Sequence, residues 1–335
     1  MKRSTLTFAL AAALLLILII LNIFCGSVSL PFSEIMAALT GGETDRITQF
    51  IVIESRLPQS LTAILCGATL AVSGLMMQTV FQNPLADPSI LGVNSGASLG
   101  VAIVMLALGG SVVSMGTVLS GFVLIVAAAF CGALLIIMLL LFFAARVKTN
   151  ITLLIIGIMI SYVTSSAISL LNYCATEQGV HSYVMWGLGN FGGVSLKAMP
   201  FFAVAMTGCI IVCTTLIKPL NALLLGMNYA ENLGINIKRT RTLILIVTGL
   251  ISAIATAFCG PISFIGLAVP HIARLTAQTA NHRTLVPLTL LLGAIVGLAC
   301  NWICALPTDG TLIPLNVITP LFGVPVILYV LLARH

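Results

Sequence analysis

The side chains that could bind a metal or carry redox chemistry are nine cysteines and four histidines. Cys209 and Cys213, like Cys300 and Cys304, are four residues apart, which places each pair on one face of a helix. The sequence has no CxxC motif, and no histidine stands at ligand spacing from a cysteine. Free cysteine in apolar surroundings behaves as a small apolar residue. We therefore expect the cysteines within the spans to pack in the core, with Cys174 near the outer end of a span, and predict no metal site.

Acid–base chemistry is equally poorly supported. Ionisable groups inside a membrane span mark proton relays and ion-coupling sites, but the long apolar runs of this chain contain no charged pair. HExxH and phosphate-binding glycine loops are absent from the sequence. The sequence predicts no catalytic site and no directly bound cofactor, so the chain is not expected to be an enzyme. An ion-coupled secondary transporter and a membrane scaffold remain as less favoured alternatives.

A polar interruption from Lys218 to Arg241 is the most informative segment of the chain. It contains two short, mostly apolar runs, Leu220–Leu225 and Tyr229–Ile235, punctuated by Gly226 and Gly234. Neither run can cross a bilayer, so both should form short helices outside it. Such a segment could dock a soluble motor protein, or it could simply lie at the membrane surface.

The elements around this segment are membrane spans. The chain has 335 residues, 60% of them hydrophobic and 7% charged, with a mean hydropathy of +1.20. This composition excludes a soluble domain. A span needs roughly 20 apolar residues, and the apolar runs provide about ten spans in one all-α transmembrane domain, residues 1–335. The runs are Thr5–Ser33, Leu57–Ala86, Ser89–Ala145 (two spans, divided near Gly109–Ser111), Thr149–Thr176, Ala198–Ile217, Thr242–Ala280 (two spans, divided near Gly260-Pro261), Thr284–Thr308 and Gly310–Ala333.

The basic residues predict the orientation. With the N-terminus in the cytoplasm, eleven of the 14 basic residues lie inside, as the positive-inside rule requires, and the C-terminus is also cytoplasmic. The eleven are Lys2, Arg3, Arg146, Lys148, Lys218, Lys238, Arg239, Arg241, Arg274, Arg283 and Arg334. The net charge of +6 is thus a topology signal. No basic cluster with interleaved aromatic residues indicates nucleic-acid binding.

Several motifs resemble one family of transport proteins. The motifs are Arg56-Leu57-Pro58, Gly67-Ala68 to Gly74, Gln82-Asn83-Pro84-Leu85-Ala86-x-Pro88, Leu91-Gly92-Val93, Leu220-Asn221 to Gly234, and Gly260-Pro261 to Arg274. Together they resemble the FecCD/BtuC permeases, the membrane subunits of type II ATP-binding-cassette (ABC) importers for iron–siderophore complexes, haem and cobalamin. The resemblance covers essentially the whole chain.

The resemblance implies a BtuC-like homodimer in the lipid bilayer of the bacterial cytoplasmic (inner) membrane. It also implies two cytoplasmic ATPase subunits, which use ATP and Mg, and an external substrate-binding protein. The segment 218–241 would be the coupling loop, and Arg56 would contact the binding protein. The implied ATPase contacts are Leu224, Gly226, Tyr229, Ala230, Leu233 and Gly234, and the implied cytoplasmic gate is formed by Asn83, Leu85, Thr149 and Asn150.

The sequence also departs from the family pattern. Met227 replaces a residue that is often acidic, and Leu298–Cys304 lacks the usual Asp and Arg. Leu312–Asn316 lacks the usual Glu-Leu-Pro-x-Gly motif. How the outer gate and the docking site are built without it is therefore an open question. An iron complex, either a siderophore or haem, is the first expectation for the cargo, with cobalamin as the alternative. Whether the partner subunit is an identical copy or a paralogue is also open.

Overall fold

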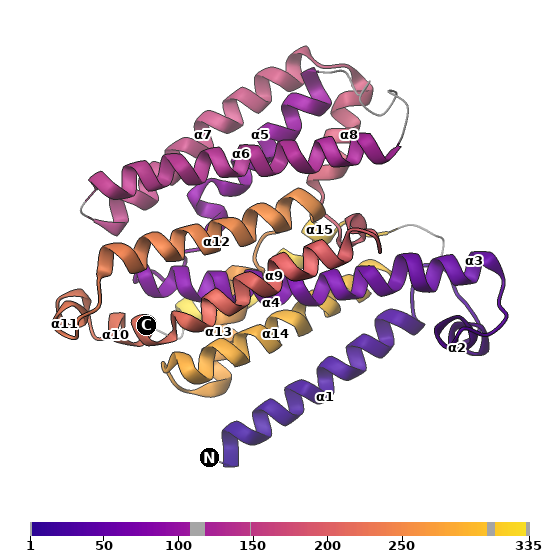
Figure 1. Cartoon of the computed structure of the whole chain (residues 1–335), viewed down its shortest axis with the longest axis horizontal. Helices are drawn as coiled ribbons and strands as arrows, with labels where there is room; N and C mark the ends of the chain where they lie inside the picture. The colour runs from indigo at the N-terminus through magenta and orange to yellow at the C-terminus, as the bar shows by residue number, and fades with distance from the viewer. Residues whose placement is uncertain (1, 108–117, 148, 307–311, 333–335) are drawn as a thin grey trace. The chain divides into compact units, whose positions relative to one another are not determined.

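The computed structural model describes residues 2–107, 118–147, 149–306 and 312–332. Within these ranges every regular element is a helix, which confirms the all-α prediction (Figure 1). The predicted boundary near Gly109–Ser111 and the charged residues Lys148 and Arg334 lie outside the described ranges. The chain forms two compact units, and each is built from segments that are distant in sequence. The prediction of a single transmembrane domain therefore stays a prediction.

The first unit comprises residues 1–72, 190–211 and 263–335. Its elements are α1 (Lys2–Phe24), α2 (Phe32–Thr40), α3 (Arg46–Gln49), η1 (Phe50–Arg56), most of α4 (Leu57–Val80), η5 (Phe191–Gly193), most of α9 (Met199–Thr215), α13 (Ile265–Ala277), α14 (His282–Cys304) and α15 (Leu315–Leu332). In this unit α14 packs against α1 and α13, and α15 packs against α13.

The second unit comprises residues 73–189 and 212–262. Its elements are the end of α4, η2 (Pro88–Leu91), α5 (Val93–Ala102), η3 (Ile103–Ala107), α6 (Val118–Arg146), α7 (Asn150–Cys174), α8 (Glu177–Gly187), the end of α9, α10 (Ile217–Leu223), α11 (Met227–Asn232) and α12 (Ile237–Cys259). Here α5 packs against α6, α7 and α12, as Figure 1 shows for α5, α6 and α7.

The apolar helices match the positions of the ten predicted spans, but not all of them have full length. Among the described residues, six helices are long and apolar enough to cross a membrane, and a seventh span results if α9 and α10, which meet at a 49° bend, are counted as one. Three further apolar helices, Val93–Ala107, Ile265–Ala277 and Leu315–Val330, are shorter than a span of roughly 20 residues. The predicted eighth span is the clearest departure, because residues 260–264 are not helical and α13 begins only at Ile265.

Close helix packing in each unit depends on glycine. In the first unit a Cβ atom on Gly67 of α4 would lie 2.2 Å from the carbonyl oxygen of Gly293 on α14. In the second unit a Cβ atom on Gly96 of α5 would lie 2.6 Å from the carbonyl oxygen of Gly132 on α6. Side chains of any size would force these backbones apart. Glycine at these positions therefore lets both pairs of helices pack with their backbones in close contact.

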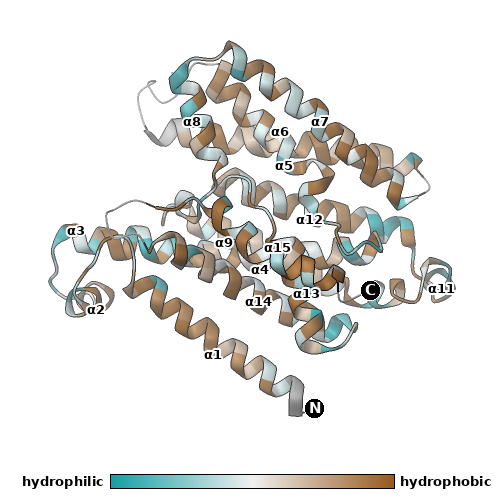
Figure 2. Ribbon diagram, turned by 180° about the vertical axis from the view of Figure 1, so that it is seen from behind, coloured by the Kyte–Doolittle hydropathy of each residue, from teal (hydrophilic) through white to brown (hydrophobic). Residues whose placement is uncertain are grey.

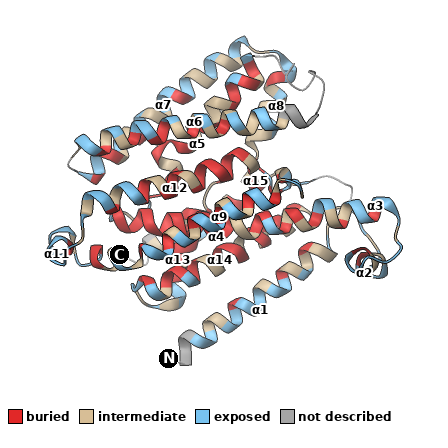
Figure 3. Ribbon diagram, in the orientation of Figure 1, coloured by how far each residue is buried: buried red, intermediate tan, exposed pale blue. Residues whose placement is uncertain are grey.

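The share of buried residues differs strongly among the spans. In the most apolar stretch of the span containing α4, 83% of the residues are buried, against 17% in α1 and in α7 (Figure 3). The exposed surfaces of α1 and α7 are nevertheless hydrophobic (Figure 2). Long apolar surfaces of this kind suit lipid or a neighbouring subunit and not water.

Candidate functional site: the docking segment and the gate turn

The polar interruption folds as two short helices, as predicted. The helix α9 bends by 49° into α10, and α11 follows after a turn at Gly226. Gly226 has φ +103° and Gly234 has φ +80°, values that favour glycine, and the space beside both is open. The two glycines therefore shape the segment and leave bare backbone at its surface.

Three of the predicted ATPase contacts are large apolar side chains that the structure exposes, and we call these three the apolar surface of the segment. Leu224, Tyr229 and Leu233 are each about half-exposed, at 46%, 55% and 57%. Ala230, by contrast, is fully buried, so its side chain packs within the protein and cannot face a partner. Of the six predicted ATPase contacts, the structure thus exposes the larger apolar side chains and the glycine backbones, and removes Ala230 from the surface.

The turn after α4 is closed by its own side chains. Asn83 Oδ1 accepts a hydrogen bond from the backbone N–H of Leu85 at 2.9 Å, which closes an Asx-turn. Asp87 Oδ1 accepts from the backbone N–H of Ser89 at 2.9 Å and from its hydroxyl, which caps η2. Burial raises the pKa of the Asp87 carboxyl, and these hydrogen bonds oppose that shift. Leu85 is left exposed at the tip of the turn.

The second pair of predicted gate residues begins α7. Thr149 caps that helix, since its side-chain oxygen accepts from the backbone N–H of Thr152 at 3.2 Å. The Asn150 side chain is buried, and its Nδ2 donates to the carbonyl of Val80, the last residue of α4, at 2.6 Å. The structure thus brings Asn150 to the helix end that leads into Asn83. Apart from Leu85, each proposed gate side chain has a hydrogen-bonding role within the chain, and gating itself stays a prediction.

Arg56 does not lie on an open surface. Its side chain is only 7% exposed, and its guanidinium donates to the carbonyls of Ile23 and Phe24 at the end of α1 and of Val28 in the loop that follows. The last carbonyls of a helix lack intrahelical donors, and the negative end of the helix dipole favours a cation. Arg56 therefore caps α1 in this structure. Contact with a binding protein stays a prediction that would require this side chain to be released.

Two buried asparagines and a half-buried glutamine in the first unit form a hydrogen-bonded chain of amides that the family motifs do not include. Asn301 Nδ2 of α14 donates to Asn22 Oδ1 of α1 at 2.8 Å, and Gln59 Nε2 of α4 donates to Asn301 Oδ1 at 2.9 Å. Asn22 Nδ2 also donates to the carbonyl of Leu298 at 3.0 Å. Through Asn301, these uncharged amides occupy the stretch of α14 that lacks the family's Asp and Arg. Isolated amides within apolar runs were the available signal, because such residues join helices in membranes.

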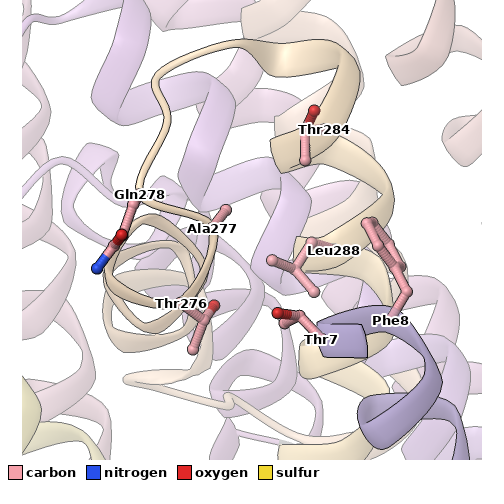
Figure 4. Close-up of a pocket in the computed structure, with 7 residues that line it drawn as sticks. All are labelled: Thr7, Phe8, Thr276, Ala277, Gln278, Thr284 and Leu288. Atoms are coloured by element: carbon pink, nitrogen blue, oxygen red, sulfur yellow. The ribbon is translucent and has the colours of Figure 1, made fainter. Parts of the chain in front are cut away.

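Neither of two cavities in the first unit could hold a large cargo. One, of about 140 Å³, is lined by Arg56, Gln59 and both asparagines of the amide chain. The other, of about 40 Å³, lies between α1, α13 and α14, where Thr7 faces Leu288 and Thr276 while Gln278 points away (Figure 4). Ligand pockets usually enclose roughly 300–1,000 Å³.

Comparison with known proteins identifies the family. The sequence profile of the FecCD transport family matches residues 14–333. The chain belongs to this family. A vitamin B12 import system permease protein, BtuC, of Klebsiella pneumoniae is 34% identical over 320 residues, covering 95% of this chain and 91% of that protein. A BtuC protein of Salmonella typhi is 35% identical over 285 residues, covering 85% of this chain and 84% of that protein.

A solved structure agrees with the sequence comparison. A metal-chelate type ABC transporter in an inward-facing conformation matches with a TM-score of 0.83 and 28% identity, over 99% of both chains. The predicted BtuC-like fold is therefore confirmed. This FecCD protein is a multi-pass membrane permease of an ABC importer.

Proposed function

We propose that this FecCD permease carries a vitamin B12-type metal chelate across the bacterial cytoplasmic membrane. The observation that carries the proposal is the name shared by relatives that are 34–35% identical along 84–91% of their length, all vitamin B12 import permeases. An iron complex is the first expectation from the family resemblance, but these relatives favour the cobalamin alternative. The cargo would pass between two copies of the chain, because the two cavities described in the first unit are too small for it.

The proposed assembly contains two permease copies, two ATPase subunits that use ATP and Mg, and an external binding protein. The apolar surface of Leu224, Tyr229 and Leu233 supports the docking of the ATPase, since a short exposed helix with such anchors suits a groove. In this assembly the permease itself hydrolyses nothing and transmits movement from the ATPase.

Transport measurements test the cargo. The complex is reconstituted in vesicles with its ATPase and binding protein and offered cyanocobalamin, a ferric hydroxamate siderophore or haemin. ATP-dependent uptake of cyanocobalamin that survives collapse of the ion gradients is the expected result. Uptake of an iron complex without cyanocobalamin would overturn the cobalamin assignment, and uptake driven by an ion gradient alone would overturn the proposed ABC mechanism.

A substitution in α11 tests the docking. Tyr229→Asp places a charge in the middle of the exposed apolar surface, and we expect at least a tenfold loss of ATPase affinity with an unchanged unfolding temperature. Asn232→Asp adds the same charge to another exposed position of α11 and is the matched control. Equal co-purification of the ATPase with both variants would remove Tyr229 from the interface. Ala230→Glu is unsuitable for this purpose because it would bury a charge inside the protein.

A further inference from the structure

Arg241 connects the segment that follows the docking helices to the junction of α6 and α7. It lies in the first turns of α12, and its Nη2 donates to the carbonyls of Ala144 and, at 3.4 Å, Val147. These carbonyls lie at the end of α6, where backbone acceptors lack helical donors. Its Nη1 donates to Asn150 Oδ1 at 3.3 Å. One guanidinium therefore holds the end of one helix and the first residue of the next.

Asn150 extends this connection to α4. Its Nδ2 donates to the carbonyl of Val80 at 2.6 Å, and its side chain is buried. Val80 ends α4, and Gln82, with φ +48°, turns the chain toward Asn83. The hydrogen-bonded path thus runs from α12 through Asn150 to the start of the turn 83–88. Its partners are 91 and 70 residues apart in sequence.

The connection to the docking segment is short. Only residues 233–236 separate α11 from α12, and Asn236 caps α12 by accepting from the backbone N–H of Arg239 at 2.9 Å. A continuous helix carries its first turn as a rigid piece. A displacement of α11 would therefore move the Arg241 side chain together with the start of α12.

We propose that Arg241 is a positioning residue that transmits movement of the docking segment to the turn 83–88 through Asn150. This inference rests on the proposed function. A guanidinium suits the task because its planar fork of donors fixes several acceptors in one geometry, which a lysine ammonium does not. If Arg241 were only a cap for α6, its removal would lower stability and leave the response of the turn unchanged.

Hydrogen exchange in the assembled complex separates these roles. Peptides covering residues 80–91 are followed with and without a non-hydrolysable ATP analogue, so the result does not depend on the identity of the cargo. We expect the nucleotide-dependent change in exchange to fall about tenfold in Arg241→Met, and less in Arg241→Lys. That factor corresponds to about 1.4 kcal/mol, near the lower end of what a hydrogen bond to a charged group contributes.

Two further variants make the result specific. Asn150→Asp keeps an acceptor for Arg241 but loses the donor to Val80, so we expect assembly with a similar loss of response. Arg239→Met removes a nearby exposed arginine of the same helix and should respond like the wild type. A full nucleotide-dependent change in exchange in Arg241→Met or Asn150→Asp would overturn this inference and leave the proposed function intact. An equal loss of that change in Arg239→Met would do the same. A wild-type chain that binds no ATPase would overturn the proposed function together with it.

Discussion

Arg56 and Arg241 each donate to backbone carbonyls at the C-terminal end of a helix, one in each unit. Arg56 is 7% exposed, and its acceptors belong to the end of α1 and the loop after it. Arg241 is less buried, and it adds a side chain, Asn150, that reaches a third helix. The first arrangement fixes one helix end, whereas the second joins α6, α7 and α4. Similar chemistry therefore serves stability in one place and a mechanical connection in the other.

The largest expected effect comes from Arg56→Met. It would leave three carbonyls without their donor, and each unsatisfied buried group costs about 1–3 kcal/mol. Because water in the adjoining cavity can recover part of this loss, we expect the free energy of unfolding to fall by about 2–4 kcal/mol. Thermal unfolding of the detergent-solubilised protein measures it, with exposed Arg46→Met as the control. Equal midpoints for the two variants would show that Arg56 does not cap α1.

Arg56→Lys sharpens the comparison because it keeps the charge and loses the guanidinium fork. If Arg56 acts only as a cap, Arg56→Lys should lose much of the stability that Arg56→Met loses. If it docks the binding protein by charge, the lysine variant should keep the association rate that the methionine variant loses, most clearly at low salt.

A smaller effect is expected from Asn301→Leu in the amide chain of the same unit. The change leaves Asn22 and Gln59 without one partner each, and interhelical hydrogen bonds in membranes contribute about 0.6–1.7 kcal/mol. We expect a loss of about 1–2 kcal/mol in the free energy of unfolding. Chemical denaturation in mixed micelles measures this loss, and Asn172→Leu, on a different helix of the second unit, is the control for removing an amide. An unchanged free energy would mean that the glycine packing of α4 and α14 alone holds this region.

The smallest effect concerns the buried acid Asp87, in the turn that Arg241 is proposed to position. Burial raises the pKa of its carboxyl above the ordinary value, so the folded protein binds that proton more tightly than the unfolded chain. Stability therefore falls as the pH rises from the ordinary Asp pKa, about 3.9, to the raised value. Asp87→Asn retains the acceptor for Ser89 and should raise stability at neutral pH by about 1 kcal/mol or less.

The pH dependence is the decisive part of that prediction. Below the ordinary Asp pKa the wild-type carboxyl is protonated in both states, so the advantage of Asp87→Asn should disappear in acid. Unfolding midpoints at several pH values measure this, with exposed Asp45→Asn as the control. A constant difference between the variant and the wild type at all pH values would contradict it.

Much of the helix pattern could be predicted from local sequence. The short helices α10 and α11 lie where two apolar runs are too short to cross a bilayer. The long helix α7 lies within the apolar run Thr149–Thr176. The predicted eighth span was wrong in extent because the apolar run beyond Gly260-Pro261 hides a non-helical stretch up to Phe264, whose φ is +70°. Hydropathy measures how apolar a segment is, and it does not report whether its backbone is helical.

The short helices that carry the candidate docking residues could be predicted, whereas the surroundings of the individual side chains could not. The exposed surface of Leu224, Tyr229 and Leu233 agrees with the family motif, since their place in a short surface helix is local. The burial of Ala230 and Arg56 was not predictable, because a charge or a small residue near a helix end fits either environment. The partner of Asn150 could not be read from its neighbours, since Arg241 lies 91 residues away.

The sequence by itself determined the class of the molecule: an all-helical membrane permease with a polar segment between its spans. Hydrophobic run length, charge placement and family motifs are properties of the chain alone, and they are enough for that conclusion. The tertiary structure decided which polar side chains form hydrogen bonds with distant parts of the same protein. Asn22 meets Asn301 across 279 residues, and Asn150 lies between Val80 and Arg241. The partners of a buried donor come from whichever distant helices pack beside it, so only the packed structure can identify them.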